Sequence, residues 1–142
     1  MPDAGEPTEE QQAILGIDES RAWTLPGLEE EVHVVYVESN IPHIYARSRE
    51  DLGRVLGFVV ASDRFFTMDL QRRLAQGRLS ELLGELGLPN DIESRQLGMT
   101  VVTERILEGF TDEDAAFVDA YVDGINAYIE AVKAKELSLI HI

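Results

Sequence analysis

The sequence carries one dense group of charged side chains whose types and spacing could do chemistry. Its members lie between residues 63 and 81: Asp63, Arg64, Asp69, Arg72, Arg73, Arg78 and Glu81. Arginines at this density could bind an anion, because each guanidinium presents a planar fork of N–H donors. At helical spacing, however, Asp69 lies within reach of Arg72 and Arg73. Arg78 is likewise within reach of Glu81. We therefore expect a partly buried ion-pair network that fixes how helices pack, rather than an anion site.

The other residues that could do chemistry lack the pattern that a site needs. His33, His43 and His141 have no metal-ligand spacing, and the chain has no cysteine, which excludes disulfides and thiolate chemistry. Neither a glycine-rich phosphate loop nor the G-x-S-x-G turn of serine hydrolases occurs. The acidic runs 29–31 and 112–114 lack the alternation of a calcium loop. We expect the first to be solvated surface and the second a helix N-terminus. The residues themselves thus assign no catalytic, substrate-binding or metal-binding role.

The composition sets the class of protein that must position these residues. The chain has 142 residues, 44% of them hydrophobic, and a net charge of −15. Its size suits one domain, and its apolar content is too high for a disordered chain. The negative charge makes a nucleic acid or an anionic membrane an unfavourable partner. We expect no membrane span, because no apolar run approaches the length that a span needs.

The residue pattern predicts an α+β fold, mostly helical, with an N-terminal β-hairpin. Residues 1–24 form an acidic, flexible leader in this interpretation, because they are polar and contain several prolines and glycines. The β-branched run that follows predicts a hairpin over residues 32–46, with Asn40 as the turn residue that takes a positive φ. Both faces of the first strand are largely apolar, so we expect both to be covered.

Helices are expected to fill about residues 49–135. Ser48 is a good N-cap, and apolar residues at helical spacing over 52–60 begin a long, kinked helix that ends at Gly77. Thr111 caps a last long helix, whose apolar stripe runs over 117–132. Shorter helices are expected between the two: residues 78–83, a helix beginning near Pro89, and residues 99–107.

Four segments resemble one enzyme family, in the order in which that family carries them. They are the hairpin segments 34–37 and 41–46; residues 57–73, similar to G-[FY]-x-x-A-x-D-R-x-x-x-M-[DE]-x-x-R-R; residues 77–84, similar to G-R-x-[AS]-E-x-x-G; and residues 119–129, similar to A-[YF]-x-x-G-[MIV]-N-A-[WY]-I. Each pattern is loose alone, but together they resemble the N-terminal part of the α chain of the penicillin acylase family. One departure lies in the hairpin, where Tyr36, Val37 and Asn40 stand in place of the family's Arg-Asp and glycine.

The resemblance implies a partial piece of an αββα N-terminal nucleophile hydrolase. Such enzymes are cut from one precursor into α and β chains, and the new N-terminal Ser of the β chain attacks the amide of an N-acyl substrate. The resemblance implies penicillin or cephalosporin side chains, acyl-homoserine lactones or related amides as substrates. It also implies calcium in the full-length enzyme and a periplasmic or secreted location. The implied partners are the β chain and the rest of the α chain.

This chain carries no junction at which such a precursor could be cut. None of its eleven glycines is followed by Ser or Thr, so no catalytic, substrate-binding or metal residue is carried over, and we expect the chain alone to be inactive. Residues 25–136 match the family's α chain. Residues 137–142 break the helical pattern and are expected to be a non-native tail on a truncated reading frame.

The alternative is a stand-alone, acidic helical interaction module without catalysis. The two interpretations differ in what an isolated chain exposes. If the chain is a fragment, we expect the apolar stripes 52–60 and 117–132 to lack their partner surface and to cause aggregation or dye binding. A stand-alone module would be a monodisperse monomer.

Overall fold

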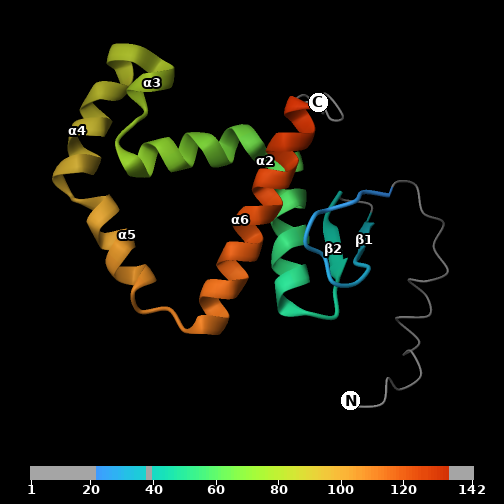
Figure 1. The fold of residues 1–142 in the computed structure, drawn as a ribbon. Coiled ribbons are helices and arrows are strands. Elements are labelled where there is room, and N and C mark those ends of the chain that lie inside the picture. The colour runs from blue at the N-terminus through green and yellow to red at the C-terminus, as the bar shows by residue number, and fades with distance from the viewer. Residues whose placement is uncertain (1–21, 38–39, 135–142) are drawn as a thin grey trace.

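Two long helices, α2 (Arg49–Gln76) and α6 (Asp112–Lys133), organise the fold of the computed structural model (Figure 1). The structure describes residues 22–37 and 40–134. The remaining elements are β1 (His33–Tyr36), β2 (Pro42–Tyr45), α3 (Ser80–Leu83), the 3-10 helix η1 (Gly84–Gly87), α4 (Leu88–Gln96) and α5 (Met99–Leu107). The predicted class, mostly helical with an N-terminal hairpin, is confirmed. The expected leader, apart from residues 22–24, and the expected tail 137–142 lie outside the described residues.

The hairpin is antiparallel, and its strands pair from His33↔Tyr45 to Tyr36↔Pro42. Asn40 has a φ of 56° and thus takes the left-handed conformation that the sequence predicts for it. One face packs against the core through Val34 and Ile44. The expected cover on both faces of the first strand stays a prediction, since His33 and Val35 on the other face are half-buried.

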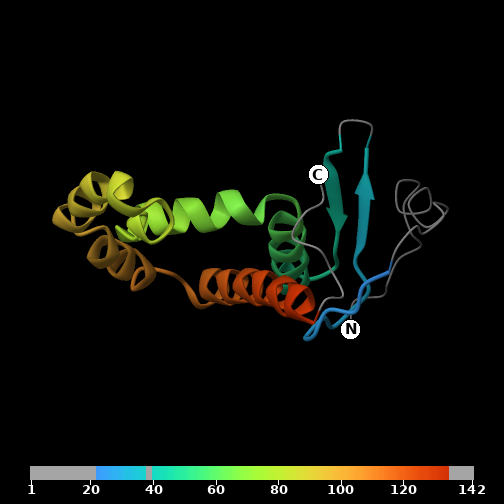
Figure 2. The ribbon, with the colours of Figure 1, turned by 90° about the horizontal axis from the view of Figure 1, so that it is seen from above.

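Helix α2 begins and ends as its sequence predicts. The backbone N–H of Asp51 donates to the Ser48 hydroxyl at 3.0 Å, and Gly77 closes the C-terminus with a left-handed φ of 63°. The predicted kink lies at Arg64, whose φ of −140° and ψ of 28° are not helical. It divides α2 into a proximal half, which packs against the hairpin and α6, and a distal half, which leads away to α3 (Figures 1 and 2).

The core lies where proximal α2 meets α6. Val55, Phe58, Val59 and Tyr128 are buried there, and the Phe58 and Tyr128 rings meet edge to face at 5.8 Å. The Thr111 hydroxyl caps α6 by accepting the Asp114 N–H at 3.2 Å, so the acidic run 112–114 forms a helix N-terminus as expected.

The exposed apolar surface lies elsewhere than the sequence suggests. The sequence predicts that the stripes 52–60 and 117–132 are exposed in an isolated fragment, but they pack largely against each other. We call the segment from α3 to α5 the arm; it carries most of the exposed large apolar side chains, and Leu86 is 87% exposed. The others on the arm include the following: Leu82, Leu83, Leu88, Ile92, Leu97, Met99, Val101, Val102, Ile106 and Leu107.

Among the described residues, no helix is long and apolar enough to cross a lipid bilayer.

Candidate functional site

Five of the seven charged residues that the sequence singles out form one chain of ion pairs. Arg72 donates to Oδ1 of Asp69 at 2.6 Å, and Arg73 donates to Oδ2 of the same carboxylate at 2.7 Å. Arg73 also donates to Glu81, which accepts from Arg78 at 2.6 Å. The network therefore joins the last turns of α2 to α3, which is the structural role that the spacing predicts.

Each of the three guanidinium groups of this network has a carboxylate partner within it, although the five charges sum to +1. Hydrogen bonds from Arg73 and Arg72 lower the pKa of Asp69, and a hydrogen bond from Arg78 is the main cause that lowers the pKa of Glu81. Since both carboxylates stay ionised, these three guanidinium groups already have anionic partners. The arrangement is that of a structural ion-pair network.

The other two residues of the predicted cluster lie apart from this network. Arg64 is the kink residue of α2, and Asp63 precedes it at the junction with the hairpin and α6. There, burial and the charge of Asp63 raise the pKa values of Tyr36 and Tyr128. Asp63 and Arg64 lie close to the other five residues in the sequence. In the structure, the α2 kink at Arg64 separates them from the ion pairs.

Two buried aspartates were missed by the sequence reasoning, and each holds a loop by its backbone. Asp51 is 1% exposed and accepts the backbone N–H groups of Glu29 and Glu30 at 3.1 and 3.2 Å. Asp91 is 3% exposed; it accepts the N–H groups of Leu79 and Ser80 at 2.6 and 2.9 Å and also the Ser80 hydroxyl. The partners lie 11 to 22 residues away along the chain, so no local sequence pattern predicts these hydrogen bonds.

The Asp91 contacts make the stability of the arm depend on pH. Burial by itself raises the pKa of Asp91, but the bonds from Ser80 and Leu79 and the charge of Arg95 outweigh it, so the pKa lies below its usual value. The stabilisation is therefore complete above the pKa of an unfolded aspartate, roughly 4, and is lost as the pH falls through the lower folded value. We expect Asp91→Ala to unfold at lower urea than the parent at pH 7, and the difference to shrink towards pH 2.

Urea titrations followed by circular dichroism at both pH values measure this effect. Glu93→Ala, on the same helix but without such bonds, is the matched control. It should unfold at the same urea concentration as the parent at both pH values. If Asp91→Ala lowered the urea midpoint by the same amount at pH 7 and pH 2, the pH dependence assigned to Asp91 would be contradicted.

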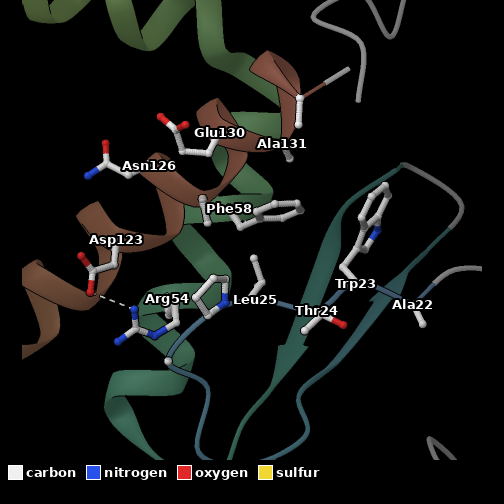
Figure 3. A pocket seen from close by; sticks show the side chains of 14 residues that line it. Ala22, Trp23, Thr24, Leu25, Arg54, Phe58, Asp123, Asn126, Glu130 and Ala131 are labelled. Carbon is white, nitrogen blue, oxygen red and sulfur yellow. Dashed lines mark hydrogen bonds and ion pairs between the residues drawn. The ribbon is translucent and has the colours of Figure 1, made fainter. Parts of the chain in front are cut away.

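A groove of about 870 Å³ lies between residues 22–27, α2 and α6 (Figure 3). Its apolar side is formed by Trp23, Leu25 and Phe58, and Arg54 donates across it to Asp123 at 2.8 Å. The full lining is as follows: Ala22, Trp23, Thr24, Leu25, Pro26, Gly27, Arg54, Phe58, Asp123, Asn126, Ala127, Glu130, Ala131 and Ala134. The one hydroxyl of the lining belongs to Thr24, and Figure 3 shows this residue apart from the two carboxylates, Asp123 and Glu130.

The histidines and acidic residues of the described chain do not form a metal site. His33 and His43 lie on different strands and are not paired with each other. In residues 22–37 and 40–134, no three His, Asp or Glu side chains converge as metal ligands would. His141 lies outside these residues.

Comparison with known proteins agrees with the fold and the motifs. The chain is 43% identical over 110 residues to penicillin acylase 2 proenzyme of Pseudomonas sp. and 34% identical over 122 residues to penicillin G acylase of Escherichia coli. It is 34% identical over 110 residues to the acyl-homoserine lactone acylase QuiP of Pseudomonas syringae. These matches cover 78%, 83% and 78% of this chain, respectively.

A solved structure shares the architecture as well as the sequence. Thermostable penicillin G acylase from Alcaligenes faecalis superposes with a TM-score of 0.67 at 30% identity, over 78% of this chain and 58% of that one. The chain spans only 14% of the length of the two curated penicillin acylases. The penicillin amidase family matches over residues 31–141, which is most of the sequence. The chain therefore belongs to the penicillin amidase family.

Proposed function

We propose that this chain is the N-terminal part of the α chain of an acylase precursor whose complete form hydrolyses N-acyl amide bonds. The observation that carries the proposal is the match to penicillin and acyl-homoserine lactone acylases over 78% to 83% of this chain. The names of these relatives support two substrate classes, the acyl side chains of penicillins and acyl-homoserine lactones.

The chemistry of this proposal requires groups that the 142 residues do not bring together. A serine hydroxyl beside its own free α-amino group would attack the amide carbonyl and release the amine. Water would then hydrolyse the resulting ester. Two observations support placing that serine on a β chain beyond this sequence: no glycine here precedes Ser or Thr, and Thr24 lies apart from the carboxylates of the groove. We propose that the calcium ligands of the full-length enzyme belong to the part of the α chain outside these 142 residues.

The proposed role of this chain is therefore structural, and its partners are the rest of the α chain and the β chain. The described residues support this role in two ways. The ion pairs and buried aspartates fix loops and helices rather than a reacting group. The arm, in addition, presents apolar side chains that a larger assembly would cover.

Acyl hydrolysis by the complete polypeptide tests the proposal. We expect release of the acyl group from benzylpenicillin or from an acyl-homoserine lactone by the mature complete protein, and none by residues 1–142 alone. Liquid chromatography with mass detection would follow both products. A folded, correctly cut complete protein that leaves every N-acyl amide intact would contradict the proposed activity, and turnover by the isolated chain would contradict its inactivity.

The stand-alone interaction module is separated from this proposal by the behaviour of the isolated chain. We expect residues 1–142 to bind a hydrophobic dye, because the apolar side chains of the arm are open to water. A variant with Leu86→Gln, Leu97→Gln and Ile106→Gln should lose most of the dye fluorescence while keeping its helical circular dichroism. Glu85→Gln, Gln96→Glu and Glu104→Gln, which change neighbouring polar residues, form the matched control. A monodisperse parent that binds no dye would favour the stand-alone module.

A further inference from the structure

The kink in α2 joins two parts of the molecule, and each part is cross-linked within itself. The first part, which we call the proximal body, comprises the following residues: 22–37, 40–63 and 112–134. Its two helices touch through their backbones at Gly57 and Gly124, where an added β-carbon would lie 2.0 and 1.9 Å from a carbonyl oxygen of the other helix. Arg54 of α2 adds an ion pair to Asp123 of α6 at 2.8 Å. Close backbone contact and directional bonds thus hold the proximal body as one unit.

The second part, which we call the distal body, comprises residues 69–97, that is, the distal half of α2 with α3, η1 and α4. Hydrogen bonds and ion pairs connect these helices to one another. Arg73 of α2 pairs with Glu81 of α3, and Arg95 of α4 donates to the carbonyl of Gly77 at 2.9 Å. The buried carboxylate of α4 adds the backbone bonds described above. The distal body is therefore also one unit.

The two bodies meet at the kink through apolar side chains. The Phe65 ring lies 5.9 Å from that of Tyr128, and Met68 packs against the same core. Such contacts are non-directional, and here they lie at the pivot, so a change of angle costs little buried area. The Ser62 hydroxyl donates to the carbonyl of Val59 at 2.8 Å, and a bond of this kind to the preceding turn bends a helix.

Helix α5 is the second connection between the bodies, and every one of its residues is exposed. Gly98 precedes it with a φ of 65°, and a β-carbon there would have no neighbour within 4 Å. At Gly109, which follows it, the nearest neighbour of a β-carbon would lie at 3.4 Å. The ends of elements, when no packing fixes them, absorb the dihedral changes of a hinge. Figures 1 and 2 show the distal body projecting away from the proximal body, with α2 and α5 as the two connections.

We propose that the kink at Arg64 is a hinge, on which the distal body turns as one unit relative to the proximal body while α5 moves as a link. The inference does not rest on the proposed activity, because both bodies and the hinge lie within this chain. Each body forms its own bonds without fixing the direction in which the arm presents its apolar side chains. The hinge thus separates the folding of the two bodies from the orientation of the arm.

N–H residual dipolar couplings of residues 1–142, measured in a weakly aligning medium, test the hinge without any substitution. A rigid molecule has one alignment tensor, whereas two hinged bodies have two tensors of different magnitude. We expect each body to fit a tensor of its own and the two magnitudes to differ by at least about 1.5-fold. One tensor that fits both bodies would overturn the hinge. Two tensors of equal magnitude and different orientation would overturn it as well, since they describe a rigid kink of another angle.

Association of copies through the arm would also change the alignment of the distal body. The variant with Leu86→Gln, Leu97→Gln and Ile106→Gln removes this cause, because it replaces exposed apolar side chains of the arm. We expect this variant to keep two tensors of different magnitude. If its couplings fitted one tensor, association would account for the difference and the hinge would be wrong.

Spin labels give an independent measurement, because the chain has no cysteine that would compete for the label. One pair of labels spans the two bodies, and two control pairs lie within the proximal and the distal body, all at exposed positions. The three pairs, in that order, are Glu93→Cys with Lys133→Cys, Glu50→Cys with Lys133→Cys, and Gln71→Cys with Glu93→Cys. We expect the distance distribution of the spanning pair to be at least about twice as wide as that of either control pair. Equal widths in the three pairs would contradict a moving distal body.

Discussion

Replacing Gly124 by alanine is expected to lower the free energy of unfolding by about 3 kcal/mol or more, because α2 and α6 touch through their backbones at this point. A β-carbon at Gly124 would lie 1.9 Å from the carbonyl oxygen of Arg54, far inside van der Waals contact. The reciprocal site is Gly57, whose β-carbon would lie 2.0 Å from the carbonyl oxygen of Tyr121. Backbone cannot rotate away as a side chain can, so the helices must separate.

The separation weakens the main core of the molecule. Val55, Phe58 and Tyr128 are buried between the two helices, and a wider gap removes contacts from all of them. Alanine has a higher helix propensity than glycine by about 1 kcal/mol, but this gain is smaller than the expected loss of packing.

Urea unfolding followed by the fluorescence of Trp23, the single tryptophan, measures the effect because its ring lies 6.0 Å from that of Phe58. Gly109→Ala is the matched control, since a β-carbon there meets nothing closer than 3.4 Å and φ is not positive. It should change the free energy of unfolding by less than about 0.5 kcal/mol. If Gly124→Ala and Gly109→Ala unfolded at the same urea concentration, the result would contradict a backbone contact between α2 and α6 at Gly124.

The sequence predicts most of the secondary structure because the signals that define it are local. Ser48 and Thr111 are followed by acidic first turns and apolar stripes, and Gly77 sits where a left-handed residue must end a helix. The Asn40 turn follows from the same kind of evidence, since few residues adopt a positive φ readily. Each of these features depends on residues within four or five positions.

The remaining features depend on contacts between distant residues, and for that reason the sequence alone does not reveal them. Whether stripe 52–60 meets stripe 117–132 or an external partner depends on the direction of the chain after the Arg64 kink. The hydrogen bonds that Asp51 and Asp91 accept likewise form only when the fold brings their partners within reach. A buried aspartate and a solvated one have the same appearance in a sequence.

The family motifs acquire a physical meaning from these contacts. Gly57 and Gly124, from two separate motifs, allow the same pair of helices to touch. Asp69 and Arg73, from the same motif as Gly57, form one chain of ion pairs with Glu81 from the motif 77–84. In the described residues the motifs thus specify packing and helix docking.

Replacing Asp51 by alanine is expected to cost about 3 kcal/mol, because it leaves two backbone donors without their charged acceptor. The Asp51 carboxylate is buried and holds the N–H groups of Glu29 and Glu30, so it attaches the segment before β1 to the first turn of α2. An amide in its place keeps one acceptor oxygen and presents an NH2 group to the other donor. Asp51→Asn should therefore lie between the parent and Asp51→Ala.

The position of Trp23 distinguishes a local effect from a global one. Its segment passes over Phe58 and is attached to α2 through the Asp51 bonds, so its release should shift the Trp23 emission to the red before the helices unfold. Glu50→Ala is the matched control, because Glu50 lies in the same first turn but is exposed, and its loss should cost less than about 1 kcal/mol. Coincident fluorescence and circular dichroism transitions in Asp51→Ala, at the urea midpoint of the parent, would show that these bonds contribute nothing to holding the segment.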